Sequence, residues 1–213
     1  MFLAHNMLIR RAIHPLVIAV RRARASVPAG LLSMFSIVIA THDSERTLVP
    51  TLAALVPGAT AGIVREVIVA DGGSQDKTEE VADIAGCRFL ASSLTVGARL
   101  KTAAGQARGD WLMFLIAGAV PGATWIDETI AFAEKTGADA RAAVFAADAG
   151  LAAALRRALL LPDARQGLIL RKSFYDALGG HRVESAAPEK GLLRRIGRRR
   201  LTTLRTSVIL PDI

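Results

Sequence analysis

From residue 35 onward, continuous apolar runs alternate with longer segments in which apolar residues recur every three to four positions. Short apolar runs predict strands and the longer periodicity predicts helices. Strands alternating with helices indicate βαβ units, and continuous apolar strands are typical of a sheet covered on both faces. The expected fold class is therefore α/β, with a mostly parallel, Rossmann-like sheet in a single domain. The predicted strands are 35–40, 66–70, 87–92, 111–117, 140–147 and 166–172, and the predicted helices are 48–56, 79–85, 96–107, 125–136, 151–161, 173–178 and 191–196.

Polar residues concentrate in the loop that follows the first predicted strand, THDSERT at 41–47. In open α/β sheets, ligands bind outside the carboxyl ends of the strands. Thr41, Asp43 and Ser44 can each cap the next helix, but one cap is enough. Together with Glu45, they exceed what a cap needs, so the surplus predicts ligand contact.

The loop after the second predicted strand, DGGSQDKT at 71–78, is the most informative segment. Asp71 stands where the strand ends, and Gly72 and Gly73 let the backbone approach another group closely. Ser74 precedes a predicted helix, whose N-terminus favours anions. A plain tight turn is the alternative interpretation.

Two common phosphate-binding motifs are excluded here. The dinucleotide fingerprint places its glycines after the first strand and its acid after the second, whereas this chain has both after the second. No G-K-[ST] sequence occurs, which excludes a Walker A loop. Asp76 followed by Glu79 instead predicts a capping box at the start of the next helix.

Four segments in order resemble glycosyltransferases of family 2, which have the GT-A fold. They are FSIVIATHDSE, REVIVADGGSQDKT, VGARLKTAAGQARGDWLMFL and QGLILRKSFYDALGGHR, and the resemblance covers most of 35–207. It implies binding of a nucleotide-diphospho-sugar and transfer of the sugar, with inversion, to a glycan or lipid acceptor.

Carried over by motif, the resemblance assigns nucleotide-sugar contacts to both loops. Asp71 matches the acid that accepts a hydrogen bond from the nucleobase, for which a carboxylate suits an imide N–H. The other assigned contacts are Thr41, Asp43 and Glu45 in the first loop and Gly73 and Ser74 in the second.

Two cations on the predicted helix 96–107, Arg99 and Lys101, are candidates to meet the diphosphate. A solvated helix face is the alternative interpretation for both.

The chain departs from the family pattern at the expected metal site. Family members carry D-x-D at the end of the strand that corresponds to WLMFL, and those carboxylates hold a divalent metal, Mg²⁺ or Mn²⁺. Here the aligned residues are Ile116, Ala117, Gly118 and Ala119, and Asp110 lies at the opposite end of the strand. No cofactor site is therefore evident, and arginine and lysine would have to balance the charge of the diphosphate.

A second departure concerns the catalytic base. The family commonly has an E-D pair after the Gly-Gly segment, and one carboxylate deprotonates the acceptor. Here Glu189 is followed by Lys190. Glu189 is the candidate base, and a first-turn acid that interacts with the helix dipole is the alternative.

The net charge of +8 is unevenly distributed. No acid precedes Asp43, and basic residues cluster near both ends, which predicts contact with an anionic membrane or simple solubility. We expect the glycosyltransferase-like domain at 35–213 and a basic extension at 1–34. The extension is interpreted as an over-extended reading frame before Met34, with a membrane-surface helix or a weak signal-like segment as alternatives. The expected location is cytoplasmic, at the inner face of the membrane, with no nucleic-acid partner.

The remaining composition narrows the chemistry. A single cysteine, Cys87, excludes an intrachain disulfide, and four scattered histidines make a zinc site improbable. A different Rossmann-like nucleotide binder, similar to the family in fold alone, is a third interpretation against which the order of the loops argues, and two hypotheses lead. One is an active glycosyltransferase without the usual metal site; the other is a non-catalytic module that kept nucleotide-sugar binding and lost turnover.

Overall fold

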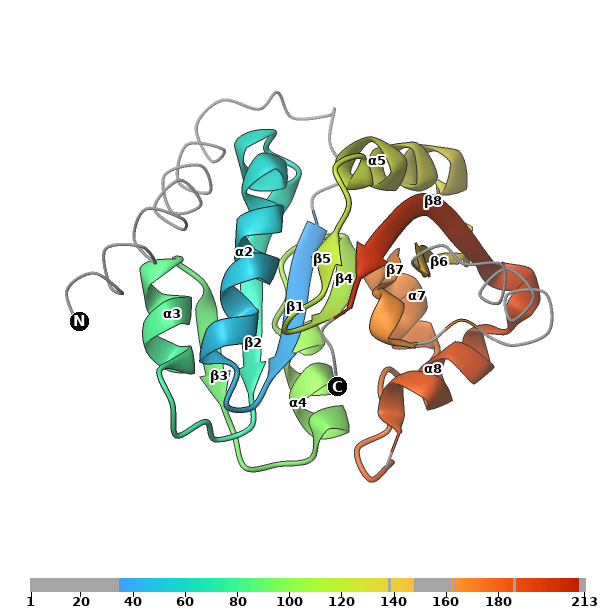
Figure 1. Ribbon diagram of the computed structural model, residues 1–213. Helices are drawn as coiled ribbons and strands as arrows, with labels where there is room; N and C mark the ends of the chain where they lie inside the picture. The colour runs from blue at the N-terminus through green and yellow to red at the C-terminus, as the bar shows by residue number, and fades with distance from the viewer. Residues whose placement is uncertain (1–34, 138, 148–161, 163, 186, 211–213) are drawn as a thin grey trace.

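The computed structural model describes residues 35–137, 139–147, 162, 164–185 and 187–210 (Figure 1). Its strands are β1 (Phe35–Thr41), β2 (Val64–Asp71), β3 (Arg88–Ala91), β4 (Trp111–Ile116), β5 (Val120–Pro121), β6 (Ala142–Ala147), β7 (Leu168–Arg171) and β8 (Leu201–Ile209). Its α-helices are α2 (Glu45–Thr60), α3 (Thr78–Ile84), α4 (Val96–Gly105), α5 (Trp125–Thr136), α7 (Lys172–Ala177) and α8 (Pro188–Ile196). Two 3₁₀ turns, η1 (Ala164–Gln166) and η2 (Arg198–Arg200), precede β7 and β8.

The strands form one mixed sheet in the order β3-β2-β1-β4-β7-β6-β8-β5. β3, β2, β1 and β4 run parallel, whereas β7 is antiparallel to both β4 and β6. β1 lies between β2 and β4, so the chain leaves β1 toward one edge and later returns to its other side. The carboxyl ends of β1 and β4 therefore flank a topological switch point, the usual ligand position in such sheets.

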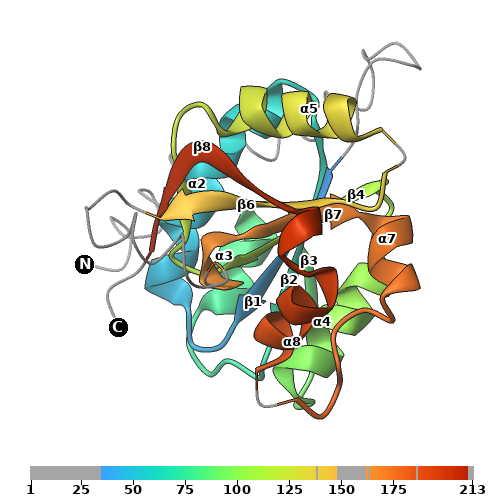
Figure 2. The same cartoon turned by 90° about the vertical axis from the view of Figure 1, so that its right-hand side faces the viewer.

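Both faces of the sheet are buried, which explains the continuous apolar strands (Figure 2). Alternate β1 residues enter opposite cores: Ile37 and Ile39 join the core with α2, α3 and α5, whereas Val38 joins the core with α4, α7 and α8. Trp111 and Trp125 are among the largest fully buried side chains of the first core. The expected α/β layers are confirmed.

The element predictions hold with three differences in the described residues, and the first is β8 (Leu201–Ile209), a segment that was not among the predicted strands. The two-residue β5 pairs with the carboxyl end of β8 and is too short to show a period of its own. Helix α3 begins at Thr78, with Lys77 rather than Asp76 as the N-cap residue, so the predicted capping box is wrong. The predicted helix 151–161 and the basic extension 1–34 lie outside the described residues.

The amino end of the sheet is held by a buried carboxylate, Glu66 on β2. It accepts hydrogen bonds from Ser36 Oγ at 2.9 Å, from Arg88 Nη1 at 3.0 Å and from Arg108 Nη2 at 2.8 Å. Burial opposes the charge, but these bonds outweigh it and lower the pKa of Glu66 to about 2. This cluster lies at the opposite end of the strands from the candidate site.

Candidate functional site

The two polar loops meet at the carboxyl ends of β1 and β2. Thr41 and Asp71 are the last residues of these strands and are paired in the parallel register. Gly72 N donates to Thr41 O at 3.0 Å, which extends the pairing by one step. The loops 41–47 and 71–78 therefore adjoin, and their binding of a nucleotide sugar stays a prediction.

Side chains of each loop bind the backbone of the other. Asp43 N donates to Ser74 Oγ at 2.8 Å, and Gln75 N donates to Asp43 Oδ1 at 2.7 Å. Ser44 N donates to Thr78 Oγ1 at 2.8 Å. The polar surplus that the sequence shows in loop 41–47 thus has a structural role: it joins the two loops into one unit.

Asp71 is the centre of this unit and is 1% exposed. Its Oδ1 accepts from Thr41 Oγ1 at 2.8 Å and from Ser74 Oγ at 2.5 Å. Its Oδ2 accepts from the backbone N–H groups of Gly73 and Ser74, both at 2.8 Å. Burial opposes the charge, but these four bonds outweigh it and lower the pKa of Asp71. A carboxylate offers about four acceptor positions, and all four are occupied within the loops.

Asp76 joins the same unit from the other end of its loop. Its Oδ2 accepts from Glu45 N at 2.8 Å, and its Oδ1 accepts from Thr78 N at 3.0 Å. Hydrogen bonds to Thr78 and Glu45 outweigh burial and lower the pKa of Asp76. Because Asp76 binds the first turn of α2 as well as that of α3, it links two helices where the sequence predicted a cap for one.

Two loop residues have backbone φ angles in the left-handed region. Asp43 has φ +47°, a conformation that Asp and Asn tolerate better than other side chains. Gly73 has φ +85°, and a Cβ there would meet no atom within 4 Å. Gly73 therefore presents bare backbone to open space, as expected where a ligand approaches.

Arg99 lies beneath the loops and is 8% exposed. Its Nη1 donates to Ala70 O at 2.7 Å and to Thr41 O at 2.9 Å. A Cβ at Gly72 would lie 3.0 Å from the guanidinium carbon, so this glycine makes room for Arg99. Burial lowers the pKa of Arg99, and the charge of Asp71 opposes that shift. These contacts support the strand ends; contact of Arg99 with a diphosphate remains a prediction, as does that of the exposed Lys101.

The turn after β4 is closed and apolar. Gly118 has φ +92°, and its N–H donates to Thr51 Oγ1 of α2 at 2.8 Å. Ala119 is fully buried in the core with α2, and its N–H donates to Ile116 O at 3.1 Å. The turn is thus packed against α2. This turn is the place at which the family pattern has two carboxylates.

This donor set does not fit a divalent metal. Mg²⁺ and Mn²⁺ prefer carboxylate, carbonyl and water oxygens, and the turn supplies no side-chain oxygen. Asp71, the nearest acid in the sheet register, already accepts four hydrogen bonds. Within the described part of the chain, no group of three or more His, Cys, Asp or Glu side chains could hold a metal ion.

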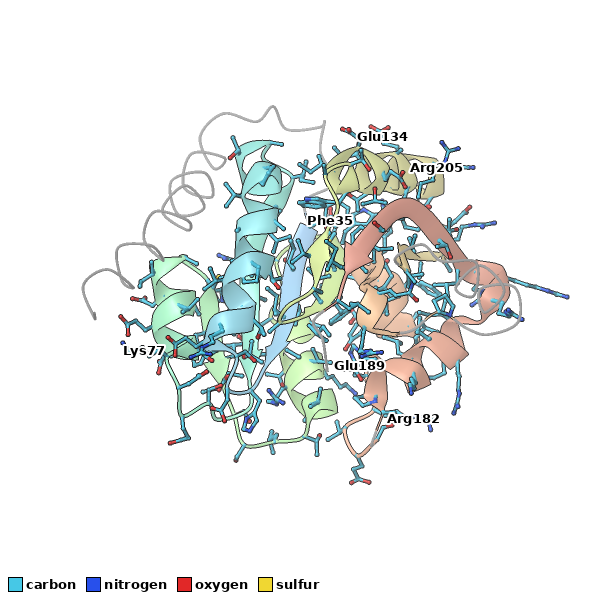
Figure 3. The ribbon with its side chains drawn as sticks, viewed as in Figure 1. Phe35, Lys77, Glu134, Arg182, Glu189 and Arg205 are labelled. Carbon is cyan, nitrogen blue, oxygen red and sulfur yellow. The ribbon has the colours of Figure 1, made fainter. Side chains whose placement is uncertain are left out.

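Glu189 lies in the first turn of α8, at the end of the molecule where β1 ends (Figure 3). The segment that leads to α8 packs against α4, because Thr95 Oγ1 donates to Val183 O and Gly97 leaves no room for a Cβ beside Arg182 O. Glu189 is half-buried. Its helix, the element predicted to carry the base, is therefore anchored beside α4.

Sequence reasoning missed a buried histidine after the Gly-Gly pair. His181 is fully buried, its N–H donates to Tyr175 OH at 3.0 Å, and its Nδ1 lies 2.9 Å from the same hydroxyl. Its ring meets Phe114 edge-on at 4.8 Å between centroids. Burial, and then the charge of Arg195, lowers its pKa to about 4. A lone histidine after two glycines gives no pattern from which this packing follows.

A sequence profile described as glycosyl transferase family 2 matches residues 36–180, which is more than half of the chain. The chain belongs to glycosyltransferase family 2. The resemblance seen in the ordered motifs is thereby confirmed, and both joined loops lie within the matched residues. No curated protein sequence matches the chain significantly.

Solved structures of two glycosyltransferases share the fold. Glucosyl-3-phosphoglycerate synthase from Mycobacterium tuberculosis, in complex with Mn²⁺, uridine diphosphate and glucosyl-3-phosphoglycerate, is 20% identical; the match covers 91% of this chain and 75% of that one, with a TM-score of 0.64. The same enzyme with Mn²⁺ and UDP-glucose gives a TM-score of 0.65 at 20% identity, covering 91% and 74%. S. aureus TarS 1–349 is 16% identical over 80% of this chain and 58% of that one, with a TM-score of 0.60. These likenesses establish the GT-A fold.

Among the described residues, no helix combines the length and the apolar character needed to cross a membrane.

Proposed function

We propose that this family 2 chain binds a nucleotide-diphospho-sugar above loops 41–47 and 71–78 and transfers the sugar to an acceptor hydroxyl. The observation that carries the proposal is the joining of these loops at the carboxyl ends of β1 and β2, with the bare backbone of Gly73 facing open space. One structurally similar enzyme, glucosyl-3-phosphoglycerate synthase, was solved with UDP-glucose, which supports this class of donor.

In this proposal Thr41, Ser74 and Asp71 act mainly by holding the loops in shape. The nucleoside then rests on Gly73 and on the exposed first-loop residue Asp43, with Glu45 at the start of α2 beside them. Asp71 contacts the nucleobase only if a ligand N–H replaces one of its four internal donors, because each is within 2.8 Å. Pre-formed loops lower the ordering cost of binding.

The transfer step uses Glu189 as general base. The acceptor oxygen attacks the anomeric carbon, the bond to the diphosphate oxygen breaks, and the acceptor proton passes to Glu189. Such displacement inverts the anomeric centre. Negative charge develops on the diphosphate. We assign Lys101, which is exposed on α4, and Arg182, which Figure 3 shows at the lower end of the molecule, to balance that charge.

The second candidate function is nucleotide-sugar binding without turnover. The closed turn at 116–119 favours it, since Gly118 N–H is bound to Thr51 and Ala119 is buried where metal-holding carboxylates are expected. The chain would then act by binding a partner protein or by holding the nucleotide sugar, and not by transferring the sugar.

Calorimetric titration with UDP- and GDP-sugars, with Mn²⁺ and with a chelator, tests donor binding. We expect one donor class to bind with an affinity that the chelator changes by less than about threefold. If no nucleotide sugar binds under either condition, the proposal is wrong.

The variant Glu189→Gln then separates the two candidate functions. It keeps the size of the side chain and removes the base, so donor affinity should stay within about twofold while transfer or donor hydrolysis falls at least about 100-fold. Glu184→Gln, an exposed acid in the same segment, is the matched control and should change neither. Donor binding without turnover in the wild type supports the binding module instead.

A further inference from the structure

Charge is segregated between two parts of the molecule. Residues 35–147 contain 13 acidic and 9 basic residues, whereas residues 164–210 contain 3 acidic and 11 basic residues. The second segment forms β7, α7, α8 and β8, on the right of Figure 1. Its net charge equals the +8 of the whole chain, so one side of the domain attracts anions.

Two exposed apolar side chains lie on adjoining loops at the end of this side. Leu94 is 59% exposed and Val183 is 44% exposed, and with Ile209 they are the exposed large apolar residues in the described ranges. Their loops touch, because Thr95 donates its hydroxyl hydrogen to the carbonyl of Val183. Single exposed apolar residues are ordinary, but two on adjoining loop tips call for a partner.

Exposed basic side chains lie in the same loop as Val183 and on the helix that follows it. Arg182 precedes Val183 in the same loop, and Figure 3 shows it at the lower end of the molecule. Lys190 and Arg194 are exposed on α8 and lie four residues apart, so they share one side of the helix. We call Leu94, Arg182, Val183, Lys190 and Arg194 the docking face.

We propose that the docking face binds the anionic phospholipid surface of a membrane. Apolar tips enter the interface between headgroups and acyl chains, while cations beside them remain at headgroup level. A nucleic-acid partner would use the cations but would leave Leu94 and Val183 without a complement, so the combination favours lipid.

Docking in this orientation has a consequence for the acceptor. The carboxyl ends of β1 and β2 lie at the lower end of Figures 1 and 2, as do the loops of Leu94 and Val183. Glu189 immediately precedes Lys190, so the candidate base would lie close to the bilayer. This part rests on the proposed function: the acceptor would be a hydroxyl carried by a membrane lipid.

Co-sedimentation of the full chain with vesicles tests the docking directly. We expect binding to vesicles of phosphatidylcholine mixed with phosphatidylglycerol and little binding to pure phosphatidylcholine. The triple variant Arg182→Gln, Lys190→Gln, Arg194→Gln should bind about 100-fold more weakly, because each cation near an anionic surface contributes about fivefold. Its binding should also depend less on salt.

The apolar tips are tested separately. Leu94→Ser with Val183→Ser should weaken vesicle binding while leaving its salt dependence unchanged, since no charge is altered. The matched control is Arg46→Gln, Lys135→Gln, Arg141→Gln, which removes the same charge from exposed positions on α2, on α5 and before β6 and should lose less than about threefold.

The basic extension 1–34 could itself bind anionic vesicles. The docking-face variants are therefore also made in a second background, the full chain with Arg10, Arg11, Arg21, Arg22 and Arg24 changed to Gln. The docking-face variants should weaken binding in both backgrounds. The proposal is overturned if they leave vesicle binding unchanged in both, or if they weaken binding to a DNA duplex and not to vesicles. Donor calorimetry is done without lipid, so failure here leaves the proposed function standing.

Discussion

At the residue scale, Asp71 is the side chain on which the candidate site depends most. It is buried, ionised and hydrogen-bonded four times, all within two loops. Sequence reasoning located it and identified its loop as functional, because an acid followed by two glycines at a strand end is unusual for a simple turn. It did not foresee that the acid would be saturated by its own loops, since this depends on the approach of Thr41 from 30 residues away.

The variant Asp71→Asn should destabilise the folded protein. The amide keeps one acceptor oxygen but places an N–H₂ group against hydroxyl or N–H donors, so about two of the four bonds are lost. Hydrogen bonds to charged groups contribute about 1.5–3 kcal/mol each, and we expect the free energy of unfolding to fall by about 3 kcal/mol.

Urea denaturation measures this change, and Asp43→Asn is the control. Asp43 is exposed, accepts one hydrogen bond from Gln75 N, and has φ +47°, which Asn tolerates. The substitution Asp43→Asn should change the free energy of unfolding by less than about 0.5 kcal/mol. Equal effects of the two substitutions would mean that Asp71 does not hold the loops.

His181 should give stability a pH dependence of its own. Its pKa is about 4 in the folded protein and about 6.5 when unfolded, because burial and Arg195 disfavour the charged ring. The unfolded chain therefore takes up this proton first as the pH falls. The contribution is complete above about pH 6.5 and is lost as the pH falls toward 4, by roughly 3 kcal/mol in total.

The test compares the wild type with His181→Asn in urea at several pH values. Asn does not titrate, and its side-chain amide can form a hydrogen bond with Tyr175 OH in place of Nδ1. We expect a flatter profile between about pH 6.5 and 4.5, with the acid loss due to Glu66 retained below about 4.5 in both proteins. Identical slopes above pH 4.5 would contradict the assignment.

At the element scale, strands and helices followed from the sequence wherever burial was two-sided. Strand β4 is apolar throughout, and β1 and β2 are apolar over their central residues 37–40 and 67–70, because helices cover both faces. Features that depend on contacts between elements were less well predicted: Asp76 accepts from Glu45 N of α2 and is not the N-cap of α3, and the two-residue β5 pairs with β8. Local sequence does not encode such partners.

Helix α4 contains two glycines with different surroundings, which permits a matched test. At Gly97 a Cβ would clash with the carbonyl oxygen of Arg182, whereas at Gly105 it would meet nothing within 4 Å. Gly97→Ala should therefore cost about 1–3 kcal/mol and displace the segment before α8. Gly105→Ala should be neutral or stabilise by up to about 1 kcal/mol. Thermal denaturation would contradict this packing if Gly97→Ala were as stable as Gly105→Ala.

The turn after β4 should resist restoration of a metal site. Ala119 is fully buried beside α2, so Ala117→Asp with Ala119→Asp places a carboxylate in the core. We expect loss of stability and no new Mn²⁺ binding by calorimetry, with Ala123→Asp, an exposed position beyond β5, as the harmless control. A gain of Mn²⁺ binding with unchanged stability would show that the turn is a metal site lacking only its ligands.

At the scale of the whole molecule, the domain combines a familiar fold with unusual chemistry at one point. The family, the α/β layers and the position of the site were predictable, because they follow from ordered motifs and from the rule that ligands bind at strand carboxyl ends. The docking face was not, because Leu94 and Val183 lie 89 residues apart and adjoin only through the contact of Thr95 with the second loop.

The central claim is that a nucleotide sugar binds on the joined loops 41–47 and 71–78. Titration of ¹⁵N-labelled protein with UDP- and GDP-sugars, followed by NMR, tests it most directly. The account predicts that the amide signals of Gly72, Gly73 and Gly118 move on binding, with and without Mn²⁺, while those of Gly62 and Gly86, at turns where the chain enters β2 and β3, stay in place. The account is contradicted if no nucleotide sugar moves the first set, or if only the second set responds.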